Sequence, residues 1–281
     1  MEWWHALILG IVEGVTEYLP VSSTGHLLLA QRLLGIESSD SADAFAICIQ
    51  SGAILAVLGL YFRRVRQMAV GVLGRDPEGL RLAINIIVAF LPAVVAGLVL
   101  EKPIKKYLFG GEEFGLWPIV AAWFVGGVAI LAVVWFRRSR AVVMRKPLGI
   151  VDLTVKSALI IGVIQCLAMW PGVSRSLVTI VGGLLVGLGL PAAVEFSFLL
   201  GVLTLTAATA YDGLKYGQEM LESFGPLPLA IGLIASWLSA VLAVKWMVAY
   251  LNRHGMAIFG FYRIALAIVV AALILAGVFQ G

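Results

Sequence analysis

Long uncharged stretches dominate this sequence and constrain its fold more than any other feature. A transmembrane helix needs about 20 mostly apolar residues, and eight stretches of comparable length contain no Asp, Glu, Lys or Arg. Only 13% of the residues are charged, whereas about 25% are charged in soluble domains. The sequence therefore predicts an all-α polytopic membrane protein. The uncharged stretches cover 45–62, 82–100, 114–136, 157–174, 176–194, 196–211, 223–244 and 264–281.

Two apolar segments are interrupted by residues that form turns. The first is predicted to be helical over 3–19, Pro20 ends that helix, and a second arm follows over 24–34. This arm would be only about 16 Å long at 1.5 Å per residue, which is too short to cross a bilayer. The segment 153–188 is interrupted in the same way. We therefore expect two re-entrant helical hairpins beside about six full transmembrane helices, which are expected at 45–62, 82–100, 116–136, 193–211, 227–249 and 257–279.

The two halves of the chain resemble each other at an offset of 152 residues. Gly10 falls on Gly162, and Val21-Ser22 falls on Val173-Ser174. Interrupted segments in corresponding positions of two halves point to a site near the bilayer midplane in inverted-repeat folds. We therefore predict one integral membrane domain over 1–281, with an inverted-topology repeat whose halves are 1–140 and 150–281.

The basic residues predict the orientation. Loop 63–81 has five arginines and the linker 137–156 has six Lys or Arg, and this topology puts both segments on one face. The face rich in Lys and Arg is cytoplasmic. Both termini are then extracytoplasmic, and the tips of the two hairpins meet within the bilayer. The opposite face would carry the loops 36–44, 101–113 and 212–225. Since the net charge of +4 lies mostly in loops, we expect no nucleic-acid partner.

The first interrupted segment concentrates polar groups that are costly inside a membrane. Glu13 and Glu17 are four residues apart, so they share one face of a helix. Two such carboxylates suit a divalent cation with oxygen ligands. Ionisable groups within a membrane segment are functional candidates by default. Hydroxyl groups and a histidine follow, at Ser22, Ser23, Thr24 and His26.

The second interrupted segment offers an arginine instead of carboxylates. A hydroxyl-rich turn at a helix N-terminus, with an arginine, suits a phosphate group. The residues concerned are Gly172, Ser174, Arg175, Ser176 and Thr179. Structural alternatives stay open, because Ser22, Thr24 and Ser176 could cap helices and Thr179 could bond to its own helix. Arg263, inside the last span, is expected to extend towards the cytoplasmic face, with a role at the site as the alternative. Gln50 could lie near the site or join helices.

The two interrupted segments resemble the signatures of a known family. E-G-V-T-E-Y-L-P-V-S-S-T-G-H at 13–26 and P-G-V-S-R-S-x-x-T at 171–179 are similar to the (E/Q)xxxE and PGxSRSxxT motifs of bacterial undecaprenyl diphosphate phosphatases of the BacA/UppP type. The resemblance runs over essentially the whole chain, including 50–57 and 195–198. It implies hydrolysis of undecaprenyl diphosphate to undecaprenyl phosphate and inorganic phosphate, aided by Mg²⁺ or Ca²⁺, in the bacterial plasma (inner) membrane. The product is the lipid carrier for peptidoglycan precursors, and the family is linked to bacitracin resistance.

The family's site residues map onto Glu13, Glu17, Ser23, His26, Ser174, Arg175, Ser176 and Thr179 of this sequence, and the roles that follow are our hypothesis. Glu13 and Glu17 would hold the cation, and Ser23 would attack with His26 or Glu17 as base, unless an activated water attacks instead. Arg175 would hold the diphosphate together with Ser22, Thr24, Gly172, Ser174, Ser176 and Thr179. Apart from the resemblance, a lipid-phosphate transporter or flippase fits an inverted repeat equally well. The sequence leaves open whether the protein is a monomer or a homodimer.

Overall fold

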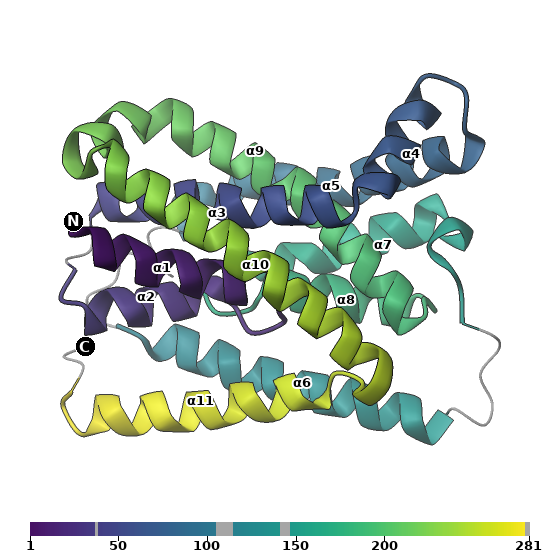
Figure 1. The fold of residues 1–281 in the computed structure, drawn as a ribbon. Coiled ribbons are helices and arrows are strands. Elements are labelled where there is room, and N and C mark those ends of the chain that lie inside the picture. Colours follow the sequence, from purple (N-terminus) through teal and green to yellow (C-terminus); the bar gives the residue numbers. More distant parts are fainter. Residues whose placement is uncertain (37–38, 105–114, 141–146, 279–281) are drawn as a thin grey trace.

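The computed structural model describes residues 1–36, 39–104, 115–140 and 147–278. Within these ranges the chain is helical, and its only β-type pairing is an isolated bridge between Leu148 and Leu188. The predicted all-α class is therefore confirmed (Figure 1). The helices are α1 (Trp3–Thr16), α2 (Ser23–Leu33), α3 (Asp40–Leu60), α4 (Phe62–Val72), α5 (Pro77–Ile104), α6 (Trp117–Arg140), α7 (Val155–Gln165), α8 (Arg175–Leu185), α9 (Leu190–Phe224), α10 (Pro226–His254) and α11 (Ala257–Leu275), with 3₁₀ turns at Ile150–Asp152 and Cys166–Met169.

Five of the described helices, α5, α6, α9, α10 and α11, are long and apolar enough to cross a membrane. A sixth crossing is reached if α3 and α4, bent by 78° at Tyr61, count as one span. Large apolar side chains on the outside of these helices are exposed, such as Leu98 at 73% and Leu242 at 70%. Such surfaces suit lipid and not water, so the chain is a multi-pass membrane protein.

Two hairpins of shorter helices lie between the long ones. α1 and α2 enter from the end of the molecule at which the N-terminus lies, and α7 and α8 enter from the opposite end (Figure 1). Ser22 and Ser174 directly precede α2 and α8, and they are the two non-glycine residues with positive φ in the described part, at 75° and 39°. The same strained position thus recurs at the 152-residue offset. The inverted repeat itself is not confirmed by this and stays a prediction.

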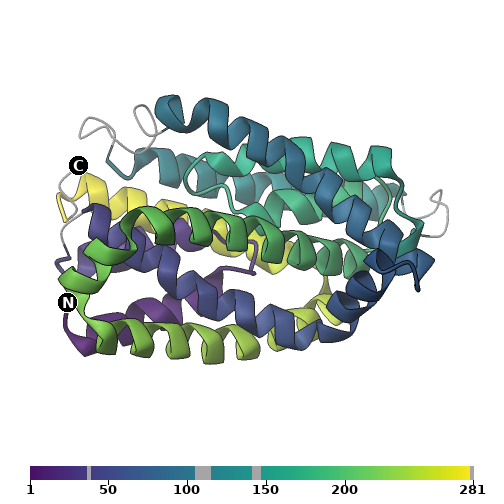
Figure 2. The same ribbon diagram turned by 90° about the horizontal axis from the view of Figure 1, so that it is seen from above.

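Glycines allow both hairpins to lie close to the long helices. A Cβ atom at Gly14 in α1 would overlap the backbone of α10 at Ser236 and Ala240, and one at Gly162 in α7 would overlap the backbone of α5 at Ala89. Helices in membranes approach closely where such small residues face each other. α9 lies between α5 and α3 (Figure 2) and also packs against α8. The long helices therefore hold the two hairpins from several sides.

Some expected boundaries were wrong. α1 ends at Thr16, before the expected 19. Residues 212–225 are not a loop, because α9 continues to Phe224 and ends only at Gly225, which has a φ of 73° and precedes a proline. The expected loop 63–81 contains α4, since its arginines and apolar residues alternate with a helical period.

Parts of three expected loops lie outside the described residues. These parts include Glu37 of the 36–44 loop, residues 105–113 of the 101–113 loop, and 141–146 of the basic linker.

Candidate active site

The tips of the two hairpins are hydrogen bonded to each other in the interior of the molecule. The hydroxyl of Ser176 donates to the carbonyl oxygen of Leu19 at 2.8 Å, and the hydroxyl of Ser174 donates to the same oxygen at 3.4 Å. The Ser174 hydroxyl also accepts from the backbone N–H of Leu177 and so caps α8. Segments about 155 residues apart in the sequence thus form one site.

Arg263 of α11 joins the same two tips. Its side chain is fully buried, and its guanidinium donates to the carbonyl oxygens of Pro20 at 3.3 Å and Gly172 at 2.9 Å. It also donates to the carbonyl oxygens of Ala122 and Trp123 in α6. The expectation that Arg263 extends to the cytoplasmic face was therefore wrong.

The physical reason is room between α6 and α11. A Cβ atom at Gly126 in α6 would fall on the Arg263 guanidinium, so the glycine leaves the space that the arginine fills. A buried cation needs partners for its hydrogens, and here backbone carbonyls supply them. Arg263 is therefore a positioning residue for both tips.

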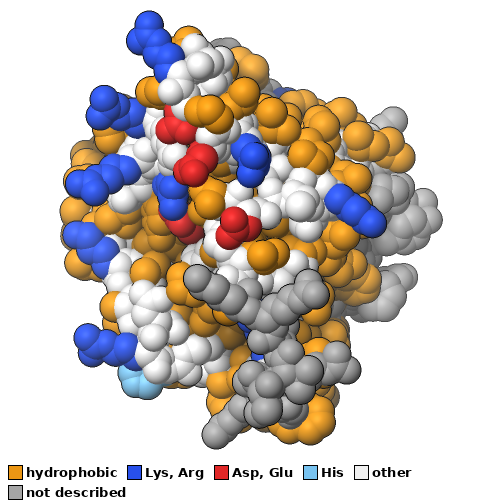
Figure 3. Space-filling model, turned by 90° about the vertical axis from the view of Figure 1, so that its right-hand side faces the viewer, with side chains coloured by type: hydrophobic (Ala, Val, Ile, Leu, Met, Phe, Trp, Pro, Cys, Tyr) orange, Lys and Arg blue, Asp and Glu red, His pale blue; other side chains and the backbone are white. Residues whose placement is uncertain are grey.

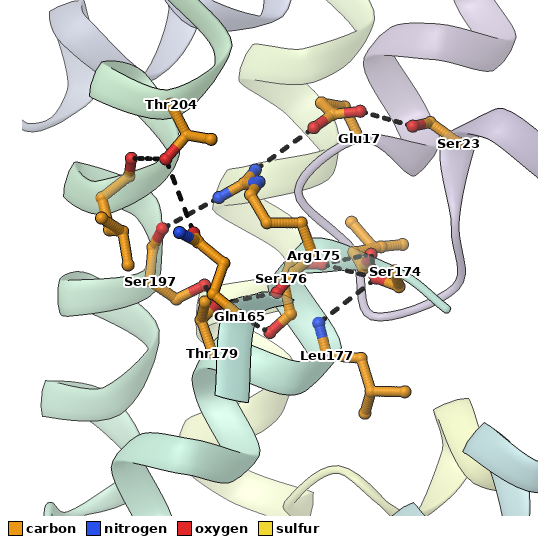
Figure 4. A network of polar contacts seen from close by, with 12 residues as sticks. Glu17, Ser23, Gln165, Ser174, Arg175, Ser176, Leu177, Thr179, Ser197 and Thr204 are labelled. Atoms are coloured by element: carbon orange, nitrogen blue, oxygen red, sulfur yellow. Dashed lines mark hydrogen bonds and ion pairs between the residues drawn. The ribbon is translucent and has the colours of Figure 1, made fainter. Parts of the chain in front are cut away.

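A chain of polar contacts crosses from one hairpin to the other (Figure 4). The hydroxyl of Ser23 donates a hydrogen bond to Glu17. The other oxygen of this carboxylate pairs with Arg175, at 3.2 Å from its Nη2. Arg175 also donates to the carbonyl oxygen of Ser197 at 3.0 Å and lies over the ring of Tyr18, 5.4 Å from its centre. The hydroxyl, the carboxylate and the guanidinium are therefore held in one fixed arrangement.

These groups border a cavity of about 270 Å³, close to the lower end of the roughly 300–1,000 Å³ typical of ligand pockets. Most of the predicted site residues line it, namely Glu17, Ser22, Ser23, Thr24, Gly172, Ser174 and Arg175. Gln50, Gln165 and Thr204 add polar groups to the wall, and Ala93, Ala168, Met169 and Leu205 add apolar ones. The cavity thus combines a polar end suited to an anion with apolar surface.

Two predicted substrate-binding residues lie outside the lining. Ser176 and Thr179 are fully buried. Ser176 bonds to Leu19, as described, and the Thr179 hydroxyl lies 2.6 Å from that of Ser197 and donates to the carbonyl oxygen of Arg175. In this arrangement both hydroxyls fix the helix that carries Arg175.

His26 makes its hydrogen bonds to groups other than the Ser23 hydroxyl. Its Nδ1 is 2.7 Å from the carbonyl oxygen of Ser22, and its Nε2 is 2.7 Å from the hydroxyl of Tyr262. The carbonyl can only accept, so Nδ1 carries a proton, and in the neutral ring Nε2 accepts from Tyr262. The side chain that accepts a hydrogen bond from the Ser23 hydroxyl is Glu17. His26 instead connects the start of α2 to Tyr262 of α11.

The second carboxylate of the predicted metal-binding pair is that of Glu13. It is fully buried, it lies beside Glu17 and Gln50, and neither of its carboxylate oxygens has a hydrogen-bond partner among the described residues. In that part of the chain no three His, Cys, Asp or Glu residues gather to hold a metal ion. Carboxylate and amide oxygens are nevertheless the ligands that Mg²⁺ and Ca²⁺ prefer. The two carboxylates and Gln50 therefore fit a divalent cation that completes its coordination with water or phosphate oxygens.

Three of the contacts in this site could not be expected from the sequence. Ser197 lies in the 195–198 stretch that resembles the family, yet nothing in that stretch indicates its bond to Thr179. Thr204, which donates to Gln165, and Tyr262 stand in no motif. Ser197 and Gly201 are four residues apart and so share one face of α9, and a Cβ atom at Gly201 would overlap the Arg175 guanidinium. This spacing is the one sequence signal that marks that face.

Comparisons with known proteins found a matching family and several relatives of this chain. A family model described as "Bacitracin resistance protein BacA" matches residues 6–269. An "Undecaprenyl-diphosphatase" of Sorangium cellulosum is 45% identical over 271 residues, which is 96% of this chain and 86% of that protein. An "Undecaprenyl-diphosphatase 2" of Rhodospirillum rubrum is 45% identical over 95% of this chain and 93% of the length of that protein. An "Undecaprenyl-diphosphatase" of Cereibacter sphaeroides is 43% identical over 97% of both chains.

Proposed function

The chain belongs to the family of bacitracin resistance protein BacA, and we propose that the cluster of Glu17, Ser23 and Arg175 performs the reaction for which its relatives are named. The protein hydrolyses undecaprenyl diphosphate to undecaprenyl phosphate and inorganic phosphate. The product carries peptidoglycan precursors, which fits the family's link to bacitracin resistance. The observation that supports this site most is the hydrogen bond from the Ser23 hydroxyl to Glu17 at the wall of the cavity.

The proposed first step is attack by Ser23 on the terminal phosphorus. The hydroxyl proton passes to Glu17, the Ser23 oxygen bonds to phosphorus, and the bond from phosphorus to the bridging oxygen breaks, which releases undecaprenyl phosphate. Glu17 then loses this proton to solvent and takes a proton from a water molecule, which attacks the phosphorus of the phosphoserine. The bond from phosphorus to the Ser23 oxygen breaks, Glu17 returns the proton to that oxygen, and inorganic phosphate leaves. A serine activated by an adjacent base is a common nucleophile, and the geometry supports Glu17 over His26 in this role. Direct attack by a water bound to Glu17 is the alternative.

Arg175 is proposed to hold the diphosphate. Phosphoryl transfer depends mainly on positioning and on electrostatic stabilisation of the phosphate oxygens. A guanidinium can donate to two phosphate oxygens at once, and the bond to Ser197 orients it. Ser22, Thr24, Gly172 and Ser174 line the same cavity and are proposed to contact the substrate. Ser176 and Thr179 are proposed to act on Arg175 and not on the substrate.

Glu13 and Glu17 are proposed to hold a divalent cation, Mg²⁺ or Ca²⁺. When bound, such an ion supplies positive charge that stabilises charge on phosphate oxygens. The support is the buried Glu13 carboxylate, since a buried charge without a partner is costly.

The protein is proposed to lie in the bacterial plasma (inner) membrane with both termini outside. The end of the molecule at α4 carries many Lys and Arg side chains (Figure 3), including the exposed Arg63 and Arg66, and such ends are cytoplasmic. The N-terminus and the end of α11 lie at the opposite end (Figure 1). Labelling of a single cysteine placed at residue 2 from either side of sealed vesicles tests this orientation. Homodimerisation stays a prediction, which the mass of the solubilised protein tests.

Phosphate release by the purified protein tests the proposed function. Undecaprenyl diphosphate in detergent or in vesicles should yield inorganic phosphate, and a chelator should abolish the release. The transporter alternative is not favoured, because the relatives are named for hydrolysis. Transport of the lipid across vesicles without release of phosphate would contradict the proposal.

A further inference from the structure

Gln165 is a buried polar residue without an assigned role. It is the last residue of α7 and is 2% exposed. Its Oε1 lies 3.5 Å from the hydroxyl of Thr204, which also donates at 2.9 Å to the carbonyl oxygen of Leu200 in its own helix. Its Nε2 has no hydrogen-bond partner in the part of the chain that the structure describes. A buried donor without a partner costs free energy, so such a group is expected where a ligand completes it.

The free donor belongs to a residue that lines the cavity. Gln165 and Arg175 both border it, and the Nε of Arg175 also has no partner among the described residues. Gln165 and Thr204 lie on the opposite side of Arg175 from Glu17 and Ser23 (Figure 4). Two residues of the cavity wall therefore each have a buried N–H donor without a partner among the described residues. An anion with several acceptor oxygens would satisfy both.

We propose that Gln165 is a further substrate-binding residue, and that its Nε2 and the Nε of Arg175 bind the phosphate that stays on the lipid. This inference rests on the proposed function, in which Ser23 attacks the terminal phosphate. The second phosphate then lies on the far side of Arg175, where Gln165 is. The residues after Gln165 include Ala168 and Met169, which line the cavity with apolar surface and suit the first isoprene unit.

The amide is well matched to a leaving phosphate. The lipid phosphate gains negative charge as its bond to the terminal phosphorus breaks, so a hydrogen bond to it strengthens in the transition state. A neutral donor adds this stabilisation without a further buried cation, which would hold the product more tightly. Glu13 stands at the equivalent position of the first half, 152 residues earlier, and a carboxylate at 165 would repel the same phosphate.

Equilibrium binding of farnesyl phosphate, a short polyprenyl monophosphate, tests the proposal by calorimetry on the solubilised full chain. Gln165→Met removes the donor, and Gln165→Glu replaces it with a negative charge but keeps an acceptor for Thr204. We expect the Kd for farnesyl phosphate to rise roughly 10- to 100-fold in Gln165→Met and further in Gln165→Glu. The Kd for inorganic phosphate should change much less, because free phosphate binds at the Ser23 end.

Gln31→Met is the matched control. Gln31 is also a buried glutamine whose Nε2 has no partner among the described residues, but it lies outside the cavity lining. The Gln31→Met variant should bind farnesyl phosphate with the same Kd as the wild type. A Kd for farnesyl phosphate that is unchanged in both Gln165 variants would overturn the inference. Equal weakening of farnesyl phosphate and inorganic phosphate would overturn the assignment to the lipid phosphate.

The binding experiment can fail or succeed independently of the phosphate-release test of the proposed function. Binding needs no turnover, so the comparison of variants decides the role of Gln165 even if the wild type releases no phosphate from undecaprenyl diphosphate. Thermal unfolding of each variant shows whether it is folded. If Gln165→Met does not fold, Gln165→Glu decides, because its carboxylate can still accept the hydrogen bond of Thr204.

Discussion

The hydroxyl of Ser23 donates a hydrogen bond to the carboxylate of Glu17, six residues earlier, across the turn that interrupts the first hairpin. The second oxygen of the same carboxylate is paired with Arg175 of the other hairpin. One carboxylate thus contacts the proposed nucleophile and the proposed phosphate ligand at once.

Glu17→Gln should lower kcat by about 10²- to 10⁴-fold, the usual contribution of a general base. The amide keeps the size of the side chain but cannot take the Ser23 proton. Phosphate release from undecaprenyl diphosphate measures the effect. Ser239→Ala is the control, because the Ser239 hydroxyl donates at 2.7 Å to Ala235 within α10, with a long contact of 3.5 Å to the carbonyl oxygen of Gly10 in α1, and Ser239 lies outside the cavity lining. The activity of this variant should match the wild type. Near-normal turnover in Glu17→Gln would remove Glu17 from the role of base.

Arg175→Lys should be almost as inactive as Arg175→Ala. A lysine keeps the charge but cannot donate to Ser197 and Glu17 and also present a planar donor pair to a phosphate. We expect kcat/KM to fall by about 10²- to 10³-fold, as when a donor to a developing oxyanion is removed. Steady-state kinetics on the two variants provide the measurement. Full activity of Arg175→Lys would show that charge alone is sufficient.

Arg263→Met should lower the free energy of unfolding by about 2–5 kcal/mol, because the carbonyl groups of both tips lose a buried donor. The activity should also fall, because the tips of the two hairpins hold the residues of the site. Arg263→Lys should recover part of both, because an ammonium reaches fewer of the four carbonyls. Arg253→Met, at the exposed end of α10, is the control for loss of an arginine. Unfolding in denaturant measures the stability, and an unchanged midpoint for Arg263→Met would contradict the positioning role.

Glu13→Gln should raise the concentration of Mg²⁺ or Ca²⁺ needed for half-maximal activity by at least about tenfold, as losing a ligand weakens a metal site. The variant should fold, because the amide is neutral and the carboxylate it replaces has no hydrogen bond among the described residues. Titration of metal into chelator-treated protein measures the shift. An identical metal dependence in variant and wild type would exclude Glu13 as a ligand.

Local sequence signals predicted the hairpins and much of the site. Glu13 and Glu17 share a helix face, Pro20 marks a turn, and the offset of 152 residues places Ser174 opposite Ser22, so two polar tips within the bilayer could be predicted. Their meeting is now visible in the bond from Ser176 to Leu19.

The remaining contacts could not be read from the sequence for physical reasons. Arg263 is held by backbone carbonyls, which every residue has, so no residue type marks its partners. The pairing of His26 with Tyr262 joins residues 236 positions apart and depends on how α2 and α11 pack. The polar end of α9 is predicted as a loop because charged residues mark the end of an apolar span, although such residues continue a helix readily.

Trapping of the phosphoenzyme tests the central claim, attack by Ser23, most directly. Undecaprenyl diphosphate labelled in its terminal phosphate would be mixed with the protein, quenched with acid within milliseconds, and the peptides analysed by mass spectrometry. We predict label on Ser23 in the wild type, no label in Ser23→Ala, and loss of turnover in that variant. Metal-dependent turnover that persists in Ser23→Ala, with no labelled serine in the wild type, would contradict the account and indicate direct attack by water.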